Sequence, residues 1–125
     1  MEGPMIVDAQ DLIQTTLLGE AAENAPLGIF VADEEMTYVA VNRRGCELVG
    51  YEREELLSLK VSDVSPFPPS REQYEEIIAR GELSGTSRLL RKDGTELDIE
   101  FWAMTTRVAQ MSVYVAFIRP LDEQA

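Results

Sequence analysis

Histidine is absent from the chain of 125 residues, and cysteine occurs once, as Cys46. Without histidine the chain cannot build a Ser-His-Asp or Cys-His catalytic system, a His-ligated haem or an ordinary catalytic zinc site. A single cysteine excludes an internal disulfide, so nothing indicates an oxidising compartment. Any catalytic site would have to use carboxylates, Lys, Arg, Tyr or Ser.

Long apolar runs and basic residues are also scarce. No stretch approaches the about 20 apolar residues of a membrane-spanning helix, and the first ten residues lack the basic start of a signal peptide. The chain has 11 Lys and Arg against 23 Asp and Glu, a net charge of −12. This charge would repel nucleic acid and anionic membrane surfaces. We therefore expect a cytoplasmic protein without nucleic-acid or membrane partners.

One segment near the N-terminus has the pattern of an amphipathic helix. We predict that it begins after Asp8, which can cap it, and ends near Asn24, before Pro26. Its apolar positions include Leu12, Ile13 and Leu17. Because this stripe is wide, it could pack on a sheet and also on a second copy of the chain.

The rest of the chain predicts two groups of strands separated by short helices. Residues that favour strands, together with turn signals, place strands at 27–33, 37–41, 86–91, 95–106 and 111–119. Asn42 is a good N-cap for a helix that ends near Gly50, and further helices are predicted at 52–57 and 70–81, with a loop at 60–70. This order favours an α+β fold with one antiparallel sheet and helices on one face.

The last strand is apolar on both of its faces. Val113, Val115 and Phe117 alternate with Tyr114, Ala116 and Ile118. Such a strand is normally covered on both sides, whereas the central helices can cover only one. The other face needs the N-terminal helix, a second protomer or both, because each large apolar side chain gains about 1.5–3 kcal/mol from burial. Trp102 lies on this second face.

Four stretches of the sequence, in order, resemble the PAS domain, a sensory module of bacterial signalling proteins. They are AAENAPLGIFVAD, YVAVNRRGCELVGYEREELL, LLRKDGTELDIE and VYVAFIRPLDE. The resemblance implies five antiparallel strands in the order 2-1-5-4-3, whose concave face and short helices enclose a pocket. It also implies an effector domain in the same parent chain. We accordingly divide the chain into an N-terminal flanking helix at 1–25, a PAS domain at 26–121 and the start of a linker at 122–125.

The resemblance raises the question of a flavin. Photoreceptors of this family carry a reactive cysteine in an NCRFLQ-like motif, where this chain has LKVSDV and Val61 takes the cysteine position. Leu89, Ile99 and Ile118 stand where those photoreceptors carry amide ligands. Flavin–cysteine photochemistry is therefore not expected, and no cofactor is predicted. Cys46 is interpreted as a small buried hydrophobic residue.

Strand alternation and the family's arrangement together predict two sets of site residues. The ligand-cavity set is Phe30, Ala32, Leu48, Val49, Leu57, Ile78, Leu89, Leu97, Ile99, Phe101, Tyr114, Ala116 and Ile118. The set for dimerisation or helix packing is Leu12, Ile13, Leu17, Ile29, Val31, Trp102, Val113, Val115 and Phe117. The cavity set is apolar except for one tyrosine hydroxyl, so a ligand would be small or elongated and mostly apolar. A filled core without a ligand is the alternative.

These features predict a non-catalytic sensory domain without catalytic residues or a metal site. It would bind a small apolar ligand, form a homodimer, or do both, and would relay the signal to an effector in a kinase, a cyclic-dinucleotide enzyme or a transcription factor. Two alternatives stay open. One is a ligand-free scaffold for protein interaction, and the other is an enzyme of related open-sheet form, which would need converging polar groups.

Overall fold

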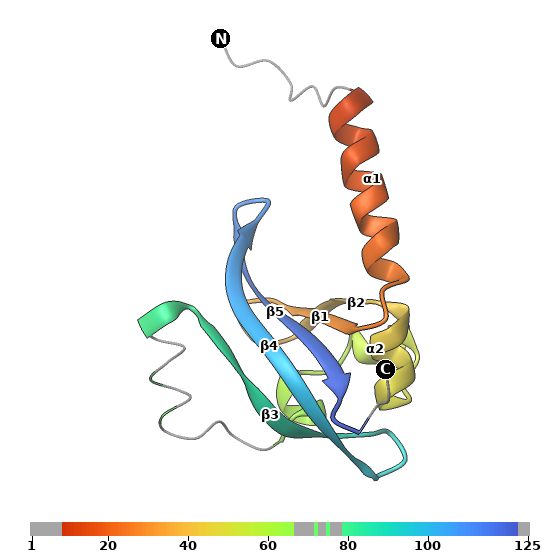
Figure 1. Ribbon diagram of the computed structural model, residues 1–125, viewed down its shortest axis with the longest axis vertical. Helices are drawn as coiled ribbons and strands as arrows, with labels where there is room; N and C mark the ends of the chain where they lie inside the picture. Colours follow the sequence, from red (N-terminus) through yellow and green to blue (C-terminus); the bar gives the residue numbers. More distant parts are fainter. Residues whose placement is uncertain (1–8, 67–71, 73–74, 76–78, 123–125) are drawn as a thin grey trace.

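The computed structural model describes residues 9–66, 72, 75 and 79–122. Five antiparallel strands form one sheet in the order β2-β1-β5-β4-β3 (Figure 1). The strands are β1 (Gly28–Ala32), β2 (Tyr38–Val41), β3 (Glu82–Leu90), β4 (Glu96–Val108) and β5 (Met111–Pro120). The helices include α1 (Ala9–Glu23), α2 (Arg43–Val49), α3 (Arg53–Leu56) and α4 (Val61–Val64). The predicted fold class and strand order are confirmed.

The three short helices cover one face of the sheet, which we call the inner face. Helix α2 packs on β1, α3 on β2 and α4 on β3. Between helices and sheet lies a core cluster of buried residues: Phe30, Ala32, Tyr38, Val41, Leu48, Val49, Leu56, Val64, Leu89, Leu97, Ile99 and Ile118. Helix α1 instead projects away from the sheet, and none of its residues is buried (Figure 1). The opposite face, the outer face, is therefore left uncovered by the described helices.

Helix α2 approaches the sheet so closely that glycines are needed on both sides of the contact. A Cβ atom on Gly45 of α2 would lie 2.7 Å from a methyl group of Val41 and 3.1 Å from the ring of Phe30. A Cβ atom on Gly28 of β1 would lie 3.0 Å from Leu48. The two glycines thus set the distance between this helix and the sheet.

Two segments differ from the sequence-based prediction. The loop predicted at 60–70 contains α4, a single helical turn, because the Asp63 carboxylate accepts a hydrogen bond from the backbone N–H of Lys60 and caps it. Strand β3 begins at Glu82, before the predicted residue 86, and pairs with β4 from its first residue. The helix predicted at 70–81 falls largely outside the described residues.

Candidate functional site

The inner face brings most of the predicted cavity residues together. Phe30, Ala32, Leu48, Val49, Leu89, Leu97, Ile99 and Ile118 belong to the core cluster, and Phe101, Tyr114 and Ala116 pack against it. Leu57 does not belong there, since it is 39% exposed. Its neighbour Leu56 is fully buried instead, because adjacent residues of a helical turn point about 100° apart and α3 directs Leu56 toward the core. Ile78 lies outside the described residues.

These side chains pack together between the short helices and the sheet. Among the described residues, one hollow on the outer face and one beside Arg91 and Pro120 at the end of the sheet both open to the surface. An enclosed ligand cavity, and with it the role of the predicted cavity residues, therefore stays a prediction.

Tyr38 is an interior residue that sequence reasoning missed. It is 6% exposed, and its ring centroid lies 5.6 Å from that of Phe30. A β-bulge in β2 explains the omission: Tyr38 pairs with Ala32 but Val41 pairs with Phe30, so both face inward although strict alternation forbids it. The irregular spacing of a bulge leaves no clear mark in the sequence.

Two tyrosines lie on either side of Ala32 on the inner face. Tyr38 and Tyr114 both pair with Ala32, from strands on either side of it, so their side chains flank its small methyl group. Burial raises the pKa of both phenols, and for Tyr38 the neighbouring Tyr114 and Asp63 raise it further. Both hydroxyls are therefore protonated at neutral pH and can donate hydrogen bonds.

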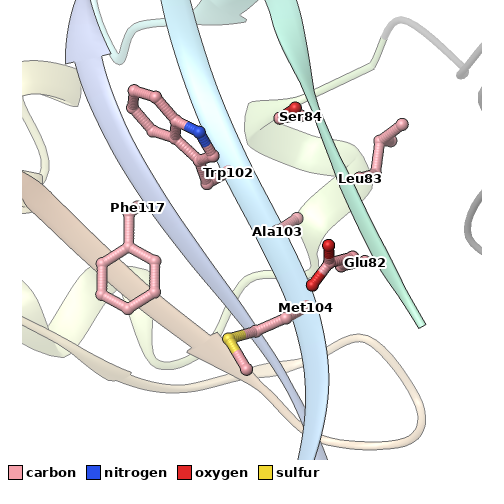
Figure 2. A pocket seen from close by; sticks show the side chains of 7 residues that line it. All are labelled: Glu82, Leu83, Ser84, Trp102, Ala103, Met104 and Phe117. Atoms are coloured by element: carbon pink, nitrogen blue, oxygen red, sulfur yellow. The ribbon is translucent and has the colours of Figure 1, made fainter. Parts of the chain in front are cut away.

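The outer face carries an apolar patch on its central strands. Six side chains form this outer patch: Ile29, Val31, Trp102, Met104, Val115 and Phe117. Trp102 pairs with Phe117, and Figure 2 shows both rings beside Met104 in an open hollow that Glu82 and Ser84 of β3 border. Trp102 is 44% and Met104 40% exposed. The structure thus leaves large apolar side chains in water on this face.

The predicted dimerisation set divides into accessible and inaccessible residues. Leu12, Ile13 and Leu17 of α1 are all more than half exposed. Val113 is 5% exposed, because the single chain already covers it, and can add little to an interface. The remaining members of the set belong to the outer patch. Helix α1 does not cover the sheet of its own chain, so the role of this face stays a prediction.

Beyond the outer patch, the face becomes charged. Arg119 on β5 donates from Nε to Glu100 on β4 at 2.8 Å, and Arg88 on β3 pairs with Glu96 on β4 at 2.9 Å. An apolar half and an ion-paired half therefore share one surface. Carboxylates held in this way are occupied by their arginines rather than directed toward a substrate.

The single cysteine lies within α2. Cys46 is half-buried and packs against the core cluster. Burial raises the pKa of its thiol, which opposes the lowered pKa of a reactive cysteine. Within the described residues, no group of three His, Cys, Asp or Glu side chains could hold a metal ion, and no helix is both long and apolar enough to cross a membrane.

The comparisons with known proteins agree with this geometry. The family model of the PAS fold matches residues 17–121. The chain belongs to the PAS family. A PAS domain from a two-component sensor histidine kinase is similar in structure, with a TM-score of 0.77 and 20% identity over 89% of this chain and 99% of that one. No curated protein matched the sequence.

Two further PAS-like structures extend the comparison. A PAS domain of an HTR-like protein from Haloarcula marismortui has a TM-score of 0.72 and 23% identity, over 90% of this chain and 96% of that one. A light-oxygen-voltage domain studied with a flavin analogue has a TM-score of 0.66 and 18% identity, over 86% of each chain. At these identities the likeness concerns the fold alone.

Apolar side chains stand at the positions where flavin-binding photoreceptors of the PAS family carry the amide ligands and the reactive cysteine. Leu89, Ile99 and Ile118 are in the core cluster, and Val61 packs against it. These apolar groups offer no hydrogen bonds to a flavin ring. The expectation that no flavin–cysteine photochemistry occurs stays a prediction, and an absorbance spectrum of the purified protein tests it.

Proposed function

We propose that this PAS domain is a non-catalytic sensory module that self-associates through the outer patch and relays its state to an effector domain of the same parent chain. The observation that carries the proposal is the uncovered outer patch, with two of its large side chains at least 40% exposed. A second protomer would remove these side chains from water, which is the main source of free energy for association.

Helix α1 supports the same assignment. Its apolar residues Leu12, Ile13 and Leu17 are exposed, and the sheet of their own chain does not use them. In a homodimer, the α1 helices could pack on each other or on the partner's outer patch. One of the similar structures is a PAS domain from a two-component sensor histidine kinase, which supports a signalling protein as the parent chain.

Substitutions in the outer patch test self-association. Trp102→Ala and Phe117→Asp remove apolar area or bring a charge into the patch, and each is expected to weaken the dimer at least tenfold, or about 1.4 kcal/mol. Val39→Asp is the matched control, because Val39 is 43% exposed on edge strand β2, away from the hollow. Sedimentation equilibrium measures the change. An oligomer that both patch variants leave unaltered would contradict the proposal.

Binding of a small, mostly apolar ligand on the inner face is the second part of the proposed function. The observation that favours it is the pair of phenol hydroxyls on Tyr38, within the core cluster, and Tyr114, which packs against it, because such groups could orient one polar end of a ligand. Native mass spectrometry of protein purified from cells tests for a bound small molecule. Phe101→Trp would fill space beside the core and is expected to abolish retention. A protein that carries no ligand in any preparation would favour the scaffold alternative.

A further inference from the structure

One buried side chain connects α1 to the sheet and to α2. Asn42 is 5% exposed, and its Oδ1 accepts hydrogen bonds from the backbone N–H of Ile29 and of Gly45, both at 2.9 Å. Its Nδ2 donates to the carbonyl oxygens of Ala22 at 2.7 Å and Leu27 at 2.9 Å. The opposite amide orientation would place donors against donors, so these partners fix the orientation.

The chemistry of Asn42 exceeds what a helix cap requires. Capping α2 needs only an acceptor for the N–H of Gly45, and Asp serves as well as Asn in that role. The amide adds two donors, and one of them reaches Ala22 in the last turn of α1. The residue thus joins the end of α1, the start of β1 and the first turn of α2.

A second link runs from α3 to the same turn of α1. Arg53 donates from Nε to the carbonyl oxygen of Val41 at 3.0 Å and from Nη2 to both carboxylate oxygens of Glu23, at 2.9 and 2.7 Å. The Arg53–Glu23 pair is about half exposed, so it stabilises the fold little by itself. Because Nε and Nη2 belong to one planar guanidinium and bind Val41 and Glu23 respectively, the contact instead restrains the direction of the groups it joins.

These two links are the prominent polar attachments of a helix that has no buried residue of its own. Both reach the last turn of α1. Both also start beside helices that pack on the sheet, since α2 contacts β1 and α3 contacts β2. A displacement of α2 or α3 therefore moves the groups that hold α1.

We infer that Asn42 and Arg53 form a mechanical coupling that sets the direction of α1 according to the packing of α2 and α3 on the sheet. This regulatory role rests on the proposed sensory function, in which α1 takes part in the signal. The coupling itself is a property of one chain and can be tested without a dimer.

Distance measurements between spin labels test whether the links set the direction of α1. One label is placed on α1 through Thr16→Cys and one on β4 through Asp98→Cys, in a Cys46→Ala background and diluted with unlabelled chain. We expect a narrow distance distribution with intact links and a clearly broader one in Asn42→Asp combined with Glu23→Ala. Asn42→Asp keeps the acceptors for Ile29 and Gly45 and loses the donors to Ala22 of α1 and to Leu27. An equally narrow distribution in the double variant would overturn the inference.

Lys92→Gln is the matched control. It removes the Lys92–Glu55 ion pair, which at 2.6 Å is as close as the pair on Arg53 but ties α3 to the β3–β4 turn rather than to α1. We expect it to leave the distance distribution unchanged. A broadening as large as that of the link variants would mean that any loss of an ion pair on α3 loosens α1, and would overturn the specific role of Arg53.

The coupling is tested by loosening α2. Leu48→Ala, or the milder Leu48→Val if the first variant does not fold, is expected to shift the mean label distance by several ångströms when the links are intact and not when they are removed. A shift of the same size without the links would overturn the coupling. Sedimentation of the same samples reports self-association separately, so a monomeric protein would reject the proposed dimer and leave the coupling result standing.

Discussion

At the scale of single residues, a polar side chain is buried in this PAS domain where its polar atoms have hydrogen-bond partners or carry no charge. Asn42 is buried because each of its side-chain hydrogen-bonding groups has a backbone partner. Tyr38 is buried against the ring of Phe30, and its hydroxyl is the single polar group of its side chain. A buried phenol is tolerated while it is neutral and becomes costly once it ionises.

Tyr38 is therefore expected to limit stability at alkaline pH. Its pKa is raised in the folded state, mainly by burial, so above about pH 10, the pKa of a free tyrosine, the unfolded chain releases a proton that the folded chain retains. Stability is complete below this pH and falls as the pH rises above it. Tyr38→Phe should keep more of its stability between about pH 10 and 11 than the parent chain.

Urea unfolding at pH 8 and pH 10.5 measures this difference. Tyr114→Phe provides the comparison, since burial raises the pKa of Tyr114 as well, and its effect should have the same sign. If Tyr38→Phe and the parent chain lose stability in parallel above pH 10, the phenol of Tyr38 is not the group responsible.

At the scale of elements, the contact of α2 with the sheet depends on backbone proximity. Alanine normally favours a helix over glycine by about 1 kcal/mol. At Gly45, however, the added methyl group would lie 2.7 Å from a methyl group of buried Val41. Here the steric penalty is larger than the gain in helix propensity, because the β-branched neighbour cannot turn away.

Gly45→Ala is accordingly expected to destabilise the domain by up to about 2 kcal/mol, from an overpacking cost of about 1–3 kcal/mol less a helix-propensity gain of about 1 kcal/mol. Thermal or urea unfolding measures it. Gly19→Ala in α1 is the control, because a Cβ atom there meets nothing within 4 Å, and it should not destabilise the chain. Val41→Ala should relieve part of the penalty in the double variant, and strictly additive effects would exclude the proposed clash.

The β4–β5 turn is a second element whose local conformation opposes its sequence. Ala109 and Gln110 both have positive φ, 51° and 66°, a region that favours Gly and Asn. Replacing them together, by Ala109→Asn and Gln110→Gly, should raise the free energy of unfolding by about 1–2 kcal/mol. Gly94→Ala in the β3–β4 turn, where φ is +88°, should lower it. A neutral result at Ala109 and Gln110 would show that the turn has another conformation in solution.

These elements show what the sequence could and could not predict. Alternation and turn signals predicted all five strands and the N-cap at Asn42, because those patterns depend on neighbours in the chain. The inward direction of Tyr38 depends on a bulge, and the burial of Leu56 rather than Leu57 depends on how α3 is rotated about its axis on the sheet. The role of Asn42 toward α1 depends on a contact twenty residues away in the sequence, which no local pattern encodes.

At the scale of the whole molecule, charge and apolar surface act against each other. The outer patch favours association of two chains, whereas the net charge of −12 opposes it. Salt shortens the range of the repulsion, with a Debye length of about 30 Å at 0.01 M and about 8 Å at 0.15 M, but leaves the contact between apolar side chains intact. Association through the outer patch should therefore strengthen as salt is added.

Sedimentation between low and physiological ionic strength measures this dependence. We expect the dimer dissociation constant to fall about tenfold over that range, or about 1.4 kcal/mol. Phe117→Asp should weaken association at both ionic strengths and keep the direction of the salt effect. Association that weakens with salt would instead indicate an interface held by ion pairs, such as those on the charged half of the outer face.

Because the polar contacts of α1 are at its last turn, a small tilt of the helix moves its first turn much further than its last. A helix of 15 residues is about 22 Å long. If it pivots at its last turn, a tilt of about 10° carries its free end through about 4 Å, while the atoms at the pivot move by a fraction of an ångström. Helix α1 is therefore a lever arm, and a rearrangement too small to disturb the core would become a displacement comparable to the width of a side chain at its far end.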